Sequence, residues 1–176
     1  KRSEITSSNH EYFLGVGDYT LVGFRKDDSG EADDFAFQVQ AGNSGGATAV
    51  FTNAKFRDPH AWYHFFVAFD STQGTANRIK VYVNGKLVDS DYGDYGVDQR
   101  SSVVQNQHDL EVGDSGTRIS IGYSPNGTSS FFDGYMAETH LLIGSAKAHT
   151  DFGETNDNGV WVPIKTSFAT SDYGSN

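Results

Sequence analysis

Two apolar segments joined by a polar loop, and followed by Asn84-Gly85, limit the folds open to this chain more than any other feature. Residues 61–88 are AWYHFFVAFDSTQGTANRIKVYVNGKLV. Apolar and polar residues alternate in 78–85, which is the period of a strand with one buried face. Asn-Gly favours a type I′ turn, because both central residues of that turn need positive φ. The stretch therefore predicts a β-hairpin, and 62–70, which is apolar on both faces, predicts a central strand.

Similar segments recur along the chain between turn residues. In 34–40, Phe35, Phe37 and Val39 share one face, which predicts a half-buried strand. A short helical pattern occurs only at 145–154. We therefore expect an all-β fold, a two-sheet antiparallel jelly-roll sandwich with at most one or two short helical turns. The remaining strand candidates are 11–17, 19–25, 48–53, 110–114, 118–123 and 134–144.

Length and charge exclude several classes of protein. The 176 residues suffice for one domain with a core, so we expect 1–176 to form a single domain. The net charge is −10, and nucleic acid is not an expected partner, because binding phosphates needs clustered Lys and Arg. No apolar run approaches the roughly 18 residues of a membrane span, so we expect no membrane insertion. Cysteine is absent, which excludes disulfides and thiolate metal sites.

Three blocks of the sequence resemble a known family. Residues 61–88 are similar to the central signature of laminin G-like, concanavalin A-like lectin/glucanase domains. The matching residues are Trp62, His64, Asp70, Tyr82, Val83, Asn84 and Gly85. A second block resembles the continuation of that pattern, at Ile121, Gly122, Phe132, Asp133, Gly134, Tyr135, Ala137, Glu138 and His140. The third block, 151–165, together with 56–64, resembles segments of such domains on bacteriophage and large-virus structural proteins.

The resemblance implies a jelly-roll sandwich, a fold that carries lectins, hydrolases, lyases and purely structural modules. Members of the family usually have further strands on both sides of this stretch. The resemblance therefore implies that 1–176 is a fragment of a longer chain. The sequence leaves the oligomeric state open, and a homo-oligomer is one alternative.

Trp62 and His64 stand two residues apart, on one face of a predicted strand. They could form a sugar-stacking platform or supply a metal ligand. Because the strand is predicted to be central, we favour a core Trp with a hydrogen-bonded His. The predicted core comprises Phe35, Phe37, Val39, Trp62, Phe66, Ile79, Val81, Val83, Ile119, Ile121, Met136 and Leu141.

The sequence lacks the patterns of the catalytic sites that this fold can carry. Retaining glycosidases need two carboxylates close together, but 31–34 (EADD) lies in a polar loop and Glu138 is a single carboxylate in a predicted strand. The Gly-x-Ser-x-Gly pattern occurs at 42–46 (GNSGG), but in a polar loop that leads into a predicted strand rather than a helix, so we expect no nucleophile elbow there. No His-Glu-x-x-His zinc motif occurs. We therefore expect no catalytic residues and no enzymatic activity, with a polysaccharide hydrolase or lyase as the third-ranked alternative.

Two acidic loops are candidate ligand sites. Carboxylates in the Gly-containing loop 26–34 suit Ca²⁺, although a solvated loop is the favoured alternative. Its candidate metal ligands are Asp27, Asp28, Glu31, Asp33 and Asp34. The loop 89–109 is long enough to suggest a function, and it mixes tyrosines with carboxylates. The tyrosine rings can stack on a sugar ring, and the carboxylates can accept hydrogen bonds from its hydroxyls. The candidate ligand-binding residues of this loop are Asp91, Tyr92, Asp94 and Tyr95.

These patterns lead to one functional expectation with a structural alternative. We expect a non-catalytic domain of the virion surface or of a tail or fibre that adheres to host glycan. In the alternative, the domain decorates a capsid or tail and contacts only neighbouring virion proteins, and the 89–109 loop packs on one of them. No cofactor is expected, apart from a Ca²⁺ ion that the acidic loops could hold.

Overall fold

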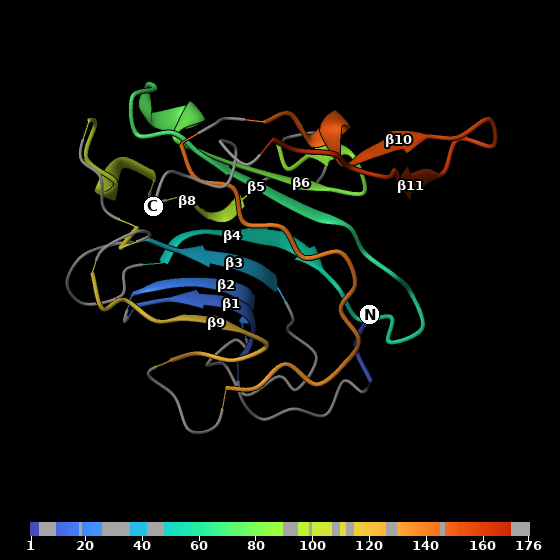
Figure 1. Cartoon of the computed structure of the whole chain (residues 1–176), viewed down its shortest axis with the longest axis horizontal. Coiled ribbons are helices and arrows are strands. Elements are labelled where there is room, and N and C mark those ends of the chain that lie inside the picture. Colours follow the sequence, from blue (N-terminus) through green and yellow to red (C-terminus); the bar gives the residue numbers. More distant parts are fainter. Residues whose placement is uncertain are drawn as a thin grey trace.

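Six strands form the largest of the three described sheets in the computed structural model, in the order β8-β4-β3-β2-β1-β9 (Figure 1). All neighbouring pairs are antiparallel. The strands are β1 (Glu11–Val16), β2 (Thr20–Arg25), β3 (Ala36–Gln40), β4 (Thr48–Lys55), β8 (Tyr95–Asp98) and β9 (Ile119–Ile121). The structure describes residues 1–3, 10–17, 19–25, 36–41, 48–89, 95–98, 100–106, 110–111, 115–125, 130–144 and 147–169.

Three strands form the smaller sheet, which packs face to face with the larger one. They are β5 (Phe65–Phe69), β6 (Ile79–Val83) and β7 (Lys86–Leu87), in the order β5-β6-β7. Asn84 and Gly85 connect the last two strands with φ values of 49° and 77°, as a type I′ turn requires. The predicted hairpin and the predicted all-β sandwich are therefore confirmed.

A separate hairpin follows near the end of the chain. It pairs β10 (Gly153–Thr155) with β11 (Trp161–Pro163), and Figure 1 shows it (orange to red) beside the smaller sheet, on the side away from the larger one. Three single 3-10 turns, one more than expected, complete the described elements: η1 (Thr75–Asn77), η3 (Arg100–Ser102) and η4 (His149–Asp151). Within the described residues, no helix is long and apolar enough to cross a membrane.

The core lies between the two sheets and is rich in phenylalanine. The Phe65 ring of the smaller sheet stacks on Phe37 of the larger one, with centroids 4.4 Å apart, and meets Phe24 edge to face at 5.7 Å. β5 therefore lies over β2 and β3. The fully buried cluster comprises Phe24, Phe37, Val39, Ala41, Val50, Phe56, Ile79, Val81, Val83, Val88 and Val103.

About half of the predicted core is correct. Phe37, Val39, Ile79, Val81 and Val83 are buried, and Phe66 and Leu141 are half-buried. Four others are exposed to solvent, which makes their assignment to the core wrong: Trp62, Ile119, Ile121 and Met136. Ile119 and Ile121 are exposed because they lie on β9. This strand is the edge of a six-stranded sheet, and the opposing sheet has only three strands with which to cover it. Phe35 lies outside the described residues.

The larger sheet is buried on both faces at β3, so the prediction of a half-buried strand is wrong. Residues 36–39 are all buried. Gln38 has no exposed surface, and its Nε2 donates a hydrogen bond of 3.0 Å to the hydroxyl of Tyr12 on β1. That bond offsets part of the cost of burying the amide, although Gln38 Oε1 has no hydrogen-bond partner among the described residues. An alternating polar residue therefore does not mark a solvent-facing side here.

Two strand predictions near the edge of the smaller sheet are also wrong. The segment 62–70 was expected at the centre of a sheet, but among the described residues β5 pairs only with β6 and so forms an edge. The segment 134–144 was expected to be a strand, but the structure assigns it none. Glu138, in its middle, has a φ of 53°, which a regular strand does not allow.

Candidate functional site

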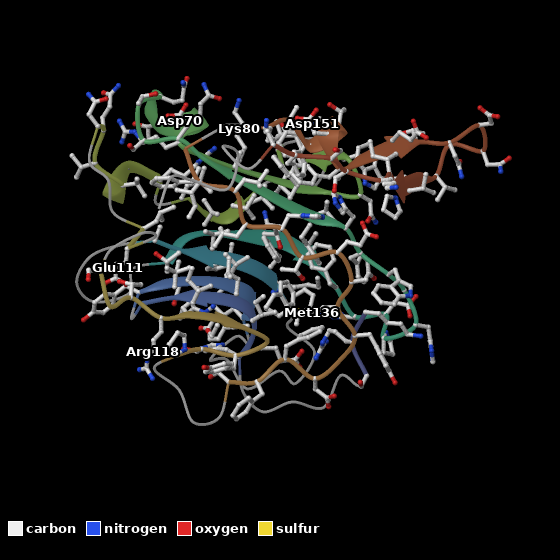
Figure 2. The ribbon with its side chains drawn as sticks, in the orientation of Figure 1. Asp70, Lys80, Glu111, Arg118, Met136 and Asp151 are labelled. Atoms are coloured by element: carbon white, nitrogen blue, oxygen red, sulfur yellow. The ribbon has the colours of Figure 1, made fainter. Side chains whose placement is uncertain are left out.

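A cavity of about 360 Å³ lies between β5 and the segment 134–144. Every residue from 62 to 70 and from 135 to 142 contributes to its lining. Successive side chains of a strand point to opposite sides, so side chains alone would give a lining of every second residue. Because the lining has no gaps, the cavity runs along the backbone of both segments. Figure 2 shows Asp70 and Met136, which both line it, well apart in the view. The cavity is therefore an elongated slot, and we call it the β5 slot.

The floor of the β5 slot is apolar. It is formed by side chains that β1 and β2 direct between the sheets, and by one ring from the chain after β9. These residues are Phe13, Leu14, Val22, Phe24 and Phe132. The Phe13 ring meets Phe132 edge to face with centroids 5.0 Å apart. A ligand inside the slot therefore has hydrocarbon beneath it, the strand β5 on one side and the non-strand segment 134–144 on the other.

Two aromatic residues at the rim of the slot are exposed. Trp62 retains 57% of its accessible surface and Tyr135 retains 63%, and both line the slot. The interpretation of Trp62 as a core residue is therefore wrong. Large exposed aromatic faces are costly to leave in water, and in binding sites they stack on apolar faces of ligands. The sugar-platform alternative for Trp62 thus regains support.

The carboxylates of the slot differ in how they are held. Asp70 accepts hydrogen bonds from the Thr72 amide at 3.0 Å, the Thr72 hydroxyl at 2.7 Å and Gln73 Nε2 at 2.9 Å. The bonds from Thr72 and then Gln73 lower the pKa of Asp70, although it lies at the surface. This carboxylate therefore stabilises its own turn. Glu138 is exposed, and its positive φ is a backbone conformation that non-glycine residues seldom adopt outside functional or strained sites.

Residues 147–169 cover the outer face of the smaller sheet with an aromatic layer, which we call the C-terminal cover. The His149 ring stacks on Tyr82 of β6, with centroids 4.2 Å apart, and Phe152 contacts Phe66 of β5 at 5.3 Å. Trp161 lies over the β6–β7 turn, where a Cβ added to Gly85 would come within 2.2 Å of its ring. The Asn84-Gly85 turn thus has a structural role, to reverse the chain and seat the cover.

One polar interaction crosses this aromatic layer. The indole Nε1 of Trp161 donates a hydrogen bond of 3.1 Å to Nδ1 of His64. His64 must therefore carry its proton on Nε2 when neutral. The expected hydrogen-bonded histidine is confirmed, and its partner comes from the C-terminal cover.

The comparisons with known proteins agree with this architecture. A family model described as the concanavalin A-like lectin/glucanases superfamily, of the laminin G type, matches residues 3–145. The chain belongs to this family. No curated protein and no solved structure matched the chain. The C-terminal cover of this laminin G-like domain lies beyond the matched range.

Membership indicates a class of ligand. The family description joins lectins, which bind sugars, with glucanases, which cleave them, so the fold suggests carbohydrate binding. It does not by itself separate binding from cleavage, because one fold carries both. The distinction depends on the residues of the site.

The sites predicted for this laminin G-like domain lie mostly outside the described residues. That holds for Asp91, Tyr92 and Asp94, and for the metal candidates Asp27, Asp28, Glu31, Asp33 and Asp34. Tyr95 begins β8, but its side chain is not described. Across the described ranges, no group of three or more His, Asp or Glu residues could hold a metal ion. Both loop sites therefore stay predictions.

Tyr135 and Glu138 line the candidate site, and the sequence did not mark either as a site residue. Both belong to the block that resembles the family, where a strand was expected, and a strand residue is usually assigned to packing. The available signal was weak: Tyr135 stands in a pattern with apolar neighbours, and nothing in the sequence marks the positive φ of Glu138.

We expect the attachment of the C-terminal cover to depend on pH through His64. Burial, and then the nearby His149, lower the pKa of His64 below its usual 6.5. Folding therefore favours the neutral ring. This contribution to stability is complete above about pH 6.5, the unfolded value, and is lost as the pH falls through the folded pKa. Protonated Nδ1 can no longer accept from Trp161.

The fluorescence of Trp161, measured in a Trp62→Phe background, should change as the pH falls below about 6.5 and through the lowered pKa of His64. His64→Gln, which keeps an acceptor but cannot titrate, should flatten that change. His60→Gln alters an exposed histidine and should leave the transition intact. An unchanged transition in His64→Gln would mean that another group controls the cover.

Proposed function

We propose that this laminin G-like domain is a non-catalytic carbohydrate-binding module on the surface of a virus particle, where it adheres to host glycan. The observation that carries the proposal is the pair of exposed aromatic rings, Trp62 and Tyr135, at the rim of one slot. The family's lectin-type fold supplies the class of ligand.

The chemistry of the rim suits a sugar. An indole or phenol ring presents an apolar face on which the C–H face of a pyranose can stack. The hydroxyls of that sugar then need polar partners, and Glu138 and His140 line the same slot. Both are exposed, so a ligand reaches them without a rearrangement of the core.

A binding role is favoured over a catalytic one by the state of the carboxylates. Retaining and inverting glycosidases both use two carboxyl groups on opposite sides of the scissile bond. Asp70 and Glu138 line the slot, but the Asp70 carboxylate already accepts three hydrogen bonds within its own turn. Glu138 is then left without a second carboxylate among the described lining residues.

The viral location is supported by sequence resemblance. Residues 56–64 and 151–165 are similar to segments of laminin G-like domains on bacteriophage and large-virus structural proteins. The second of these segments contains β10 and β11 of the C-terminal cover. An acidic surface, with a net charge of −10, also keeps an extracellular particle soluble.

The test is a glycan array probed with the wild-type domain and with Trp62→Ala and Tyr135→Ala. We expect defined glycans to bind, and each substitution to weaken binding by about fivefold, because a lost stacking contact is worth roughly 1 kcal/mol. Phe131→Ala is the matched control: Phe131 is 58% exposed but does not line the slot. If all three variants bind like the wild type, the rim does not hold the sugar.

A second candidate function is structural decoration through protein contacts alone. It is favoured by the exposed apolar side chains Ile119, Ile121 and Phe131, which retain 50%, 57% and 58% of their surface. Exposed apolar patches mark interaction sites more often than chance. An array with no bound glycan, together with firm binding to other proteins of the same particle, would establish this function in place of adhesion.

A further inference from the structure

The edge of β5 that borders the slot has a defined hydrogen-bonding pattern. On the opposite edge, His64 O accepts from Asn84 N at 2.9 Å, and Asp70 N donates to Arg78 O at 2.8 Å. In an antiparallel pair, alternate residues direct both backbone groups to the same partner. The even-numbered residues therefore pair with β6, and Phe65, Val67 and Phe69 direct their N–H and C=O groups into the slot.

The segment across the slot does not satisfy these groups. Within the described residues, β5 pairs only with β6, and no backbone hydrogen bond joins 62–70 to 134–144. Both runs nevertheless line the same cavity along their whole length. The slot thus has a hydrogen-bonding edge on one side and an apolar floor beneath it, which is the arrangement beside an incomplete sheet.

A sugar, an acyl chain and an extended peptide differ in how well they match the apolar floor and the hydrogen-bonding edge of the slot. A sugar buried on the floor would leave its hydroxyls facing Phe13, Phe24 and Phe132. An acyl chain would match the floor but leave the N–H and C=O groups of β5 without partners, which is costly once water is excluded. An extended peptide satisfies both, because its backbone pairs with β5 while alternate side chains pack on the floor.

We propose that the β5 slot binds an extended strand of a partner polypeptide, which adds to the smaller sheet beside β5. The strand carries apolar residues at alternate positions to meet the floor. Its flanks are polar and carry no single sign of charge, because the charged residues that line the slot are of both signs, Lys1, Arg2 and Lys147 against Asp70 and Glu138. The inference does not depend on the proposed glycan site, which uses the exposed rings at the rim.

The added partner strand would cover a part of the larger sheet that the smaller sheet does not cover. With three strands set against six, one added strand beside β5 lies about 4.8 Å further across the larger sheet, toward β1 and β9. Met136, which lines the slot and is 40% exposed, is positioned to contact the added side chains. Insertion therefore extends the hydrophobic core as well as the sheet.

The probe is a synthetic peptide of about nine residues that alternates Val and Thr between a terminal lysine and a terminal glutamate, a length that matches the run 62–70. Binding is measured by fluorescence anisotropy, and site-resolved hydrogen exchange is followed on the 1–176 chain. At saturating peptide, we expect the amides of Phe65, Val67 and Phe69 to exchange at least about tenfold more slowly. The amides of Phe66 and Ala68, which already pair with β6, should change little.

Two N-methylated peptides make the test independent of protein folding. One carries methyl groups on the Val amides and the other on the Thr amides, so each blocks one edge of the added strand. We expect one of them to bind at least about tenfold more weakly and the other to bind like the parent, because only one edge pairs with β5. Which peptide fails reports whether the strand runs antiparallel or parallel to β5.

Matched protein variants place the peptide in the slot. Leu14→Phe adds volume to the floor and should weaken binding at least about tenfold, whereas Val160→Phe changes an exposed residue of the C-terminal cover and should have no effect. Absence of peptide binding, equal weakening by both methylated peptides, or protection confined to other strands would each overturn the proposal. Self-association of the chain with the same β5 protection, and no peptide binding, would identify a second copy as the occupant and overturn it too.

Discussion

We expect Phe37→Ala to lower the free energy of unfolding by about 3–5 kcal/mol, the usual cost of removing a fully buried phenylalanine. Phe37 has no exposed surface, and its ring lies parallel to that of Phe65, 4.4 Å away with an interplanar angle of 6°. This stack joins the two sheets, so its loss leaves a cavity at their interface. Urea unfolding followed by circular dichroism measures the effect.

Trp62→Ala is the informative control for that measurement. Tryptophan is the larger side chain, and its position in a predicted central strand indicates a cost as large as that of Phe37. Because 57% of its surface is exposed, we expect a loss below about 1 kcal/mol. Equal losses in the two variants would show that Trp62 is packed in the core, and the proposed glycan rim would lose its main residue.

The hairpin and the inner face of β6 were predictable because their determinants are local. Asn84 and Gly85 take positive φ values whatever surrounds them, since the two-residue turn demands it. Ile79, Val81 and Val83 alternate with polar residues, and all three are fully buried. Period and turn chemistry together therefore determine which face of this strand turns inward.

The place of a strand within its sheet was not predictable, because it depends on strands far away in the sequence. Trp62 and Ile121 sit in segments as apolar as the buried ones. Ile121 is exposed because β9 is an edge, and Trp62 is exposed in the segment that precedes β5, the edge of the smaller sheet. An apolar pattern indicates that a strand has a face to bury, but not whether the opposite sheet is wide enough to cover it.

The candidate site illustrates the same limit. His64 and Trp161 are 97 residues apart in sequence, and neither segment indicates that the other will bond to it. The expectation that His64 needs a partner follows from chemistry, since buried imidazoles are hydrogen-bonded. The identity of that partner follows only from the way the C-terminal cover folds onto the smaller sheet.

The second large effect concerns a buried ion pair that no sequence pattern indicated. Arg2 and Glu11 are 2% and 0% exposed. The guanidinium donates to both carboxylate oxygens, from Nη2 at 2.8 Å and from Nε at 3.1 Å. We expect Glu11→Ala to lower the free energy of unfolding by about 3–5 kcal/mol, because it leaves the arginine charge buried without its carboxylate. Urea unfolding measures this loss as well.

Replacement of both partners separates the cost of an unpaired charge from the value of the pair. An Arg2→Met, Glu11→Leu double variant removes both charges and keeps similar volume, so we expect it to recover most of the loss and to lie within about 2 kcal/mol of the wild type. If the double variant is as unstable as Glu11→Ala, the pair itself holds residues 1–3 against β1. If Glu11→Ala alone costs less than about 1 kcal/mol, water reaches the guanidinium, and this end of the chain is not packed as the structure has it.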